Sequence, residues 1–142
     1  MIAVASDHGG FELKEAVKKH LEKRGLEYKD FGTYDMKSCD YPDFGRPAAE
    51  AVASGECDRG IVICTTGIGI SMVANKVKGV RCALCSEKTS ARLTREHNDA
   101  NMLAMGGGLI GTLQALEIVD TFLDTPFSGE EKHVRRVSKI EQ

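Results

Sequence analysis

Short apolar segments alternate with segments of helical periodicity along the whole of this 142-residue chain. Such alternation is typical of an α/β fold, in which each strand is followed by a helix that packs on a parallel sheet. The expected strands are residues 2–6, 26–31, 60–64, 80–85 and 102–105. The sequence therefore predicts a three-layer α/β/α Rossmann-like sandwich with a five-stranded parallel sheet, formed as a single domain over residues 1–142.

The segments between these strands carry helix and loop signals. Residues 11–24 have apolar side chains at helical spacing and are followed by Gly25, a residue type that commonly ends helices. Residues 65–69 contain two glycines and form a turn that leads into a helix ending near residue 75. The other expected helices are residues 47–53, 87–96, 114–123 and 130–140. Gly, Asp, Ser and Pro crowd residues 32–42, which predicts a loop near the edge of the sheet.

The charge balance argues against a nucleic-acid partner. The chain has 19 Lys and Arg against 21 Asp and Glu, and it contains no run of five like charges. We therefore expect no nucleic-acid partner.

The apolar stretch of residues 1–5 runs directly into Ser6-Asp7-His8. This stretch is too short for a signal peptide or a membrane span. The expected location is cytoplasmic, without contact to a membrane.

The five cysteines indicate reduced thiols, because their number is odd and their spacing forms no disulfide framework. Cys82 and Cys85 form the only CxxC pair. They lie in an expected strand, where residues three apart point to opposite faces of the sheet. There is no second CxxC and no HxxxH, so the sequence predicts neither a metal site nor a cofactor.

Three polar clusters are candidates for a functional site. Ligands of open parallel sheets bind beyond the carboxyl ends of the strands. Residues 6–10 follow the first expected strand, residues 64–71 follow the third, and residues 97–99 lie between the fourth long helix and the last strand. We expect the three clusters to face one crevice.

The loop after Cys64 carries the strongest signal. Gly67 and Gly69 let the backbone approach a ligand, and the following helix presents free N–H groups and the positive end of its dipole. The same field would stabilise the Cys64 thiolate as a base or nucleophile. The alternative is a buried core cysteine at the end of a strand. Met72 and Ile70 occupy positions where a dinucleotide fingerprint needs Gly and a cysteine phosphatase needs Arg, so both of those functions are disfavoured.

The histidines each have a structural alternative. His97 is either a site residue or a histidine at the surface end of a helix. Asp7, before His8, is either a site residue or a helix cap. His20 lies among lysines and is expected to be solvated. The basic last helix is either a binding element or a helix whose cations favour its own dipole.

Several motifs together resemble one known family. They are Ser6-Asp7-His8-Gly9-Gly10, Asp40-Tyr41-Pro42, Cys64, Thr66-Gly67-Ile68-Gly69-Ile70-Ser71, Ala74-Asn75-Lys76, Gly79-Val80-Arg81, His97-Asn98-Asp99-Ala100-Asn101 and Arg136. Over almost its full length the chain resembles the ribose-5-phosphate isomerase B family, which includes galactose-6-phosphate and allose-6-phosphate isomerases. The resemblance implies metal-independent interconversion of ribose 5-phosphate and ribulose 5-phosphate through a cis-enediolate.

The resemblance also implies a role for individual residues. Cys64 would be the C–H base, Thr66 would shuttle a proton between O1 and O2, and His97 and Asp7 would act in ring opening. Some members have a Glu at the position of Ile70, so this chain resembles the cysteine type. The implied anion hole consists of Gly67, Ile68, Gly69 and Ile70. The implied sugar and phosphate ligands are His8, Asn98 and the basic helix with Lys132, His133 and Arg136. The implied assembly is a homodimer, or a dimer of dimers, with the active site at the subunit interface.

The chain departs from the family pattern at three substrate-binding positions. Thr65 stands where Gly is usual, and Gly108 and Lys132 each stand where Arg is usual. Losing an arginine loses a bidentate phosphate contact, so we expect an altered substrate preference. The alternatives are an isomerase of a six-carbon sugar phosphate, an isomerase of a free rare sugar, and a non-catalytic sugar-phosphate binder.

Overall fold

A five-stranded, all-parallel sheet forms the centre of the molecule. The computed structural model describes residues 1–142. The strands are β1 (Ile2–Ser6), β2 (Tyr28–Asp30), β3 (Arg59–Cys64), β4 (Cys82–Leu84) and β5 (Met102–Gly106). Their order is β2-β1-β3-β5-β4, so β3 is central and β2 and β4 are the edges. The predicted fold class is confirmed.

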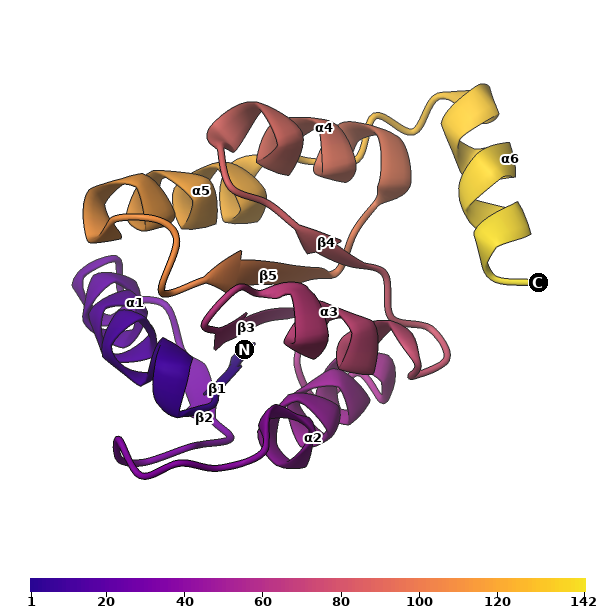
Figure 1. Ribbon diagram of the computed structural model, residues 1–142. Helices are drawn as coiled ribbons and strands as arrows, with labels where there is room; N and C mark the ends of the chain where they lie inside the picture. The colour runs from indigo at the N-terminus through magenta and orange to yellow at the C-terminus, as the bar shows by residue number, and fades with distance from the viewer.

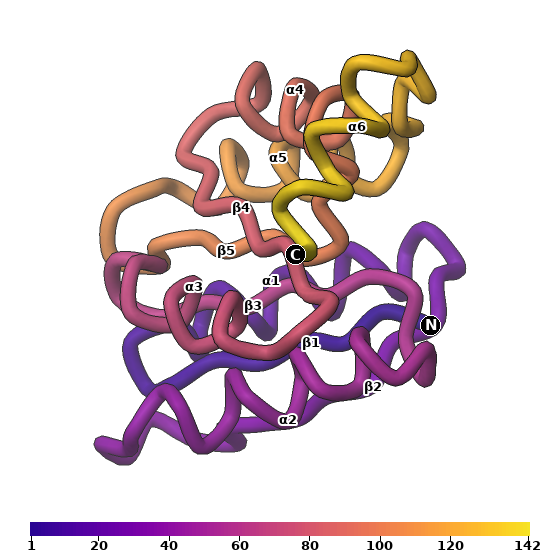
Figure 2. The backbone as a smooth tube through the Cα atoms, turned by 90° about the vertical axis from the view of Figure 1, so that its right-hand side faces the viewer, coloured from indigo at the N-terminus to yellow at the C-terminus, as the bar shows by residue number.

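Helices cover both faces of the sheet (Figure 1). The helices are α1 (Phe11–Lys23), α2 (Tyr41–Ala53), α3 (Ile68–Asn75), α4 (Lys88–Asn98), α5 (Thr112–Asp124) and α6 (Glu131–Ile140), with the 3-10 turn η1 (His8–Gly10) before α1. One buried apolar cluster joins the sheet to α1, α4 and α5, and a second joins it to α2 and α3. Helix α6 stands apart from the sheet, beside α4 (Figures 1 and 2). No helix combines the length and apolarity needed to cross a membrane.

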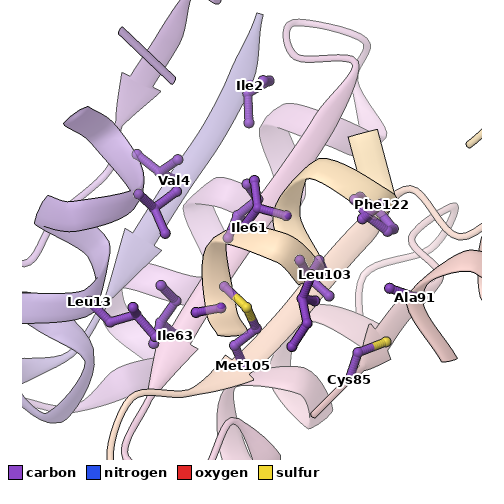
Figure 3. Packing of buried hydrophobic residues seen from close by; sticks show 14 of the residues in the cluster. Ile2, Val4, Leu13, Ile61, Ile63, Cys85, Ala91, Leu103, Met105 and Phe122 are labelled. Carbon is purple, nitrogen blue, oxygen red and sulfur yellow. The ribbon is translucent and has the colours of Figure 1, made fainter. Parts of the chain in front are cut away.

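Residues of the central strand alternate between the two apolar clusters. Ile61 and Ile63 point toward α1 and α5, as Figure 3 shows, whereas Val62 and Cys64 point toward α2 and α3. All residues of β3 from position 60 onward are buried, as expected for a strand covered on both faces. The prediction for the CxxC pair is also confirmed, because Cys85 belongs to the first cluster and Cys82 packs against the second.

Two local predictions are wrong. The second helix begins at Tyr41 and not at residue 47, because Pro42 occupies the first turn, where the missing N–H costs nothing, and Pro47 is accommodated inside the helix. Tertiary packing stabilises this longer helix, since Gly45 lies so close to α3 that a Cβ there would be 2.7 Å from Ile70. His20 is not simply solvated, because its Nε2 lies 2.7 Å from Asp120 of α5.

The buried position of Leu103 in β5 gives a test of this packing. Leu103 is fully buried, so Leu103→Ala is expected to lower the free energy of unfolding by about 2–5 kcal/mol through lost burial and the cavity left behind. Leu113 on α5 is 76% exposed, and Leu113→Ala should change the same quantity by less than about 0.5 kcal/mol. Urea unfolding of both variants measures the difference. Equal effects would contradict the assigned burial.

Candidate active site

The carboxyl ends of β1, β3 and β5 bring one set of predicted residues together. Ser6 pairs with Ile63, and Cys64 pairs with Gly106. Since neighbouring strands lie about 4.8 Å apart, the residues that follow them meet at the same edge. We call this set the carboxyl-edge cluster. It comprises Asp7, His8, Cys64, Thr65, Thr66, Gly67, Ile68, Gly69, Ile70 and Gly108.

Cys64 lies near the amino end of α3, and only 5% of its surface is exposed. The backbone N–H of Gly67 donates to its Sγ at 3.1 Å, a contact that is stronger for a thiolate than for a thiol. Gly67 has φ 78°, and a Cβ there would lie 2.8 Å from the Met105 carbonyl oxygen. The turn that delivers this N–H therefore requires glycine.

Three other thiols, which are buried or half-buried, lie in different surroundings. Burial raises the pKa of Cys57, Cys82 and Cys85 above the ordinary cysteine value, which disfavours their thiolates. None of these three follows the carboxyl end of a central strand. Cys64 is the cysteine whose sulfur accepts a backbone N–H at a helix amino end.

Fewer N–H groups of the predicted anion hole are free to bind a ligand than the sequence implies. Of its four N–H groups, that of Gly67 is used by Cys64, and that of Ile68 donates to Thr66 Oγ1 at 3.1 Å. The N–H groups of Gly69 and Ile70 have no acceptor within the chain. They are the first-turn donors of α3 that remain available for a ligand oxygen.

Asp7 and His8 are held by backbone N–H groups. Asp7 is buried, and its carboxylate accepts from the Gly10 N–H at 3.1 Å, which caps η1. The predicted capping role of Asp7 is thus present. His8 Nδ1 accepts from the Cys39 N–H at 3.2 Å. Both residues lie next to β3, because the Asp7 N–H donates to the Ile63 carbonyl at 3.3 Å.

Thr65 fills the space between two glycines. A Cβ at Gly9 would lie 2.0 Å from Thr65 Oγ1, and a Cβ at Gly108 would lie 2.9 Å from Thr65 Cγ2. The Gly108 N–H also donates to the Thr65 carbonyl at 2.9 Å. The side chain at position 65 and the absence of side chains at positions 9 and 108 therefore depend on one another.

The remaining predicted ligands form a second group, the α4–α6 cluster. It comprises His97, Asn98, Lys132, His133 and Arg136, which line one cavity of about 420 Å³. A larger cavity of about 720 Å³ adjoins it, and both are lined by Asn98 and Ile140.

Contacts within the α4–α6 cluster leave one cation free. The His97 and His133 rings lie in contact, with centroids 4.6 Å apart and planes tilted by 35°, and His133 Nδ1 lies 2.7 Å from Ser128 Oγ. Lys132 is 3.6 Å from Glu130, a carboxylate in the same cavity. Arg136 has no carboxylate within 4.0 Å. The cluster can therefore take an anion, chiefly through Arg136.

The expectation that all three polar clusters face one crevice within the chain is wrong. Met102, at the start of β5, pairs with the start of β3, whereas Cys64 pairs with Gly106 four residues later. Those four steps span about 13 Å. Asn98 precedes Met102, so the α4–α6 cluster lies toward the opposite end of the strands. The physical reason is that α4 runs back across the sheet from the carboxyl end of β4 to the amino end of β5.

Arg81 organises the α4–α6 cluster, a role that the sequence did not reveal. Its guanidinium donates to the carbonyls of Asn98 at 3.0 Å and Asp99 at 2.8 Å, and to the Glu141 carboxylate at 2.5 Å. One side chain thus ties the end of α4 to the end of α6. The only sequence signal was its place in Gly79-Val80-Arg81, which says nothing of a contact 60 residues away.

No three His, Cys, Asp or Glu side chains are grouped to hold a metal ion. The available groups are a thiol with an N–H donor, a buried carboxylate, a hydroxyl, two free helix N–H groups and, apart from these, an imidazole pair with a free arginine.

Comparison with known proteins identifies the family. The model of the Ribose/Galactose Isomerase family matches residues 2–140. Ribose-5-phosphate isomerase B of Escherichia coli is 46% identical, over 99% of this chain and 96% of its own. The galactose-6-phosphate isomerase subunit LacB of Clostridium acetobutylicum is 38% identical, over 100% of this chain and 82% of its own. The structure of Clostridium thermocellum ribose-5-phosphate isomerase B has a TM-score of 0.97 at 56% identity, over 99% of this chain and 94% of that one. The chain therefore belongs to the Ribose/Galactose Isomerase family, a family of enzymes.

Proposed function

We propose that this protein is an aldose–ketose isomerase that interconverts ribose 5-phosphate and ribulose 5-phosphate without a metal ion. The observation that carries the proposal is the position of Cys64, whose sulfur accepts the Gly67 N–H beside the free N–H groups of Gly69 and Ile70. A base next to oxyanion donors is what enediolate chemistry requires. The two ribose-5-phosphate isomerases B named above support this choice of substrate.

The proposed reaction moves one proton between adjacent carbons. Cys64 Sγ, as thiolate, takes the proton from C2 of the open-chain aldose, and the electron pair forms the C1–C2 double bond of the enediolate while O1 gains the negative charge. The N–H groups of Gly69 and Ile70 stabilise that charge. Thr66 carries the proton from O2 to O1, since its Oγ accepts from Ile68 and its own hydrogen is free to donate. Cys64 then returns its proton to C1, which yields the ketose.

Ring opening and phosphate binding are assigned to the α4–α6 cluster. His97 acts as acid and base at the sugar ring, with Asp7 assisting at the ring oxygen. Asn98 and Arg136 bind the sugar and phosphate, and Lys132 adds a cation. His133 holds the His97 ring through the contact between the two rings. His8 binds the sugar phosphate from the carboxyl-edge cluster.

A second copy of the chain completes the site in this proposal. The two clusters lie toward opposite ends of the strands of one chain, so one chain cannot bring Cys64 and His97 to the same sugar. In a homodimer with two-fold symmetry, the α4–α6 cluster of each chain faces the carboxyl-edge cluster of its partner. Exposed apolar side chains on both elements support such an interface. They are Val134 and Ile140 on α6 and Ile68 and Met72 on α3.

Substitution of Cys64 tests the base. Cys64→Ala is expected to reduce turnover of ribose 5-phosphate at least about a hundredfold, because the proton acceptor is lost. The metal-stripped wild type should form ribulose 5-phosphate in deuterated water, followed by NMR. The matched control is Cys57→Ala, since Cys57 is also buried but precedes the amino end of β3, whereas Cys64 ends that strand. Turnover that survives in Cys64→Ala would overturn the assignment, and a wild type that binds without turnover would indicate a non-catalytic binder.

Mixing two inactive variants tests the shared site. Cys64→Ala and His97→Ala are unfolded together and refolded. Half of the resulting dimers are mixed, and each mixed dimer has one site with both residues intact, so activity should reach about a quarter of the wild-type value. Variants refolded separately and then assayed together serve as the control. A co-refolded mixture that is no more active than the control would show that each site belongs to a single chain.

The packing of Thr65 predicts an energetic coupling with position 108. Gly108→Arg alone forces a Cβ to within 2.9 Å of Thr65 Cγ2, so it should destabilise the fold, and adding Thr65→Gly should recover part of that loss. The coupling free energy from urea unfolding of both single variants and the double variant is expected to be about 1 kcal/mol. Additive effects would mean that the two positions are independent. The same variants, assayed with ribose 5-phosphate and allose 6-phosphate, report whether Thr65 selects five-carbon substrates.

A further inference from the structure

The segment between β2 and α2 is attached to the start of the carboxyl-edge cluster. Ser6, the residue before Asp7, donates its N–H to the Gly32 carbonyl at 2.6 Å. The Thr33 N–H donates back to the Ser6 carbonyl, also at 2.6 Å. The loop of residues 33–40 therefore begins as an extension of the sheet beside the turn that carries His8.

A buried cation fixes the start of this loop. The Lys14 side chain is fully buried, and its Nζ donates to Asp30 at 2.6 Å and to the Thr33 carbonyl at 2.5 Å. Burial lowers the pKa of Lys14, and the contact with Asp30 opposes that shift. The ammonium also lies 5.3 Å from the ring centre of Tyr34. A buried lysine needs such partners, and its contact with the Thr33 carbonyl makes the loop one of them.

The other end of the loop contacts His8. The Cys39 N–H donates to His8 Nδ1 at 3.2 Å. A backbone amide nitrogen can only donate, so Nδ1 must present its lone pair. In a neutral imidazole the single proton is then on Nε2. Nε2 has no partner within the chain, and His8 is partly exposed, so this N–H is available to a ligand.

We propose that residues 33–40, anchored by Lys14, are a positioning element that holds His8 as its Nε2–H tautomer. His8 then serves the site as a neutral hydrogen-bond donor to an oxygen of the sugar phosphate, and not as a base. Cys39 acts through its main chain, because its Sγ lies farther from Nδ1, at 3.9 Å. The identity of the ligand oxygen rests on the proposed function, whereas the tautomer does not.

Nitrogen NMR of the histidine rings tests the tautomer directly. Wild-type protein labelled with ¹⁵N in its histidines is compared at neutral pH with His8→Gln, which assigns the His8 signals. The expected spectrum shows Nε2 protonated and Nδ1 unprotonated. A protonated Nδ1, or a ring that averages between both tautomers, would overturn the proposal. Because this readout does not involve turnover, it distinguishes failure of the tautomer from failure of the proposed isomerase activity.

Two substitutions at Cys39 separate the amide from the thiol. Cys39→Pro removes the N–H, and Cys39→Ala keeps it. The tautomer signature should persist in Cys39→Ala and be lost in Cys39→Pro, whose KM for ribose 5-phosphate should be about five- to tenfold above that of Cys39→Ala, as for one lost hydrogen bond. The kcat should change much less. Equal KM values in the two variants, or loss of the signature in Cys39→Ala, would contradict the role of the amide.

Lys14→Met tests the anchor while leaving the sequence of residues 33–40 unchanged. Asp30 keeps Lys18 at 2.9 Å in this variant, so the carboxylate is not left unpaired. We expect the His8 signature to weaken, together with a several-fold rise in KM. Retention of the wild-type signature would show that the loop holds His8 without Lys14. If Cys39→Pro does not fold, the wild-type spectrum and this variant still decide the proposal.

Discussion

The parallel register of β1, β3 and β5 determines where every candidate group of this protein lies. Because Cys64 pairs with Gly106 and Ser6 pairs with Ile63, the loops after these strands share one edge of the sheet. The same register sends the end of α4, with His97 and Asn98, to the other end. Parallel strands need return helices, so the fold separates the two clusters by construction. In the proposed homodimer, each chain would supply one of the two clusters to a complete site.

Backbone groups, more than side chains, shape the carboxyl-edge cluster. Cys64 accepts an N–H from Gly67, Asp7 accepts one from Gly10, and His8 accepts one from Cys39. Each donor is fixed by a turn or a loop whose own contacts lie in the sheet. The side chains of the cluster are therefore held in place before a ligand binds. In the proposed reaction, the free N–H groups of Gly69 and Ile70 are the donors that need no reorganisation when charge develops on a sugar oxygen.

Sequence reasoning predicted the three inner strands well because their apolar runs are short and distinct. It made both edge strands too long, since residues 26–31 and 80–85 were expected where β2 spans Tyr28–Asp30 and β4 spans Cys82–Leu84. It located the carboxyl-edge residues because they closely follow β1, β3 and β5. It placed His97 at the wrong end of the sheet, because it applied the carboxyl-end rule to a residue at the end of a return helix, which finishes near the amino end of the next strand. It also overlooked Lys14, although Lys14 shares the helix face of Val17 and Leu21, which are buried with it. A lysine on an apolar stripe is the signal that would have found it.

Arg81 and the Cys39 amide were beyond sequence reasoning for a different reason. Their contacts join positions 60 and 31 residues apart, and no local pattern encodes such distances. The Cys39 contact uses the main chain, so the residue type at that position carries little information. The Cys39 amide reaches the His8 imidazole because the loop of residues 33–40 begins beside Ser6, at the end of β1.

The interlocked packing of Thr65 with Gly9 and Gly108 constrains the order in which these three positions can be substituted. A side chain at position 9 or 108 meets the Thr65 side chain at once. A change at either glycine is therefore better tolerated after Thr65 has been replaced by a smaller residue. A library that varies the three positions one at a time would not sample the combinations in which two of them change together.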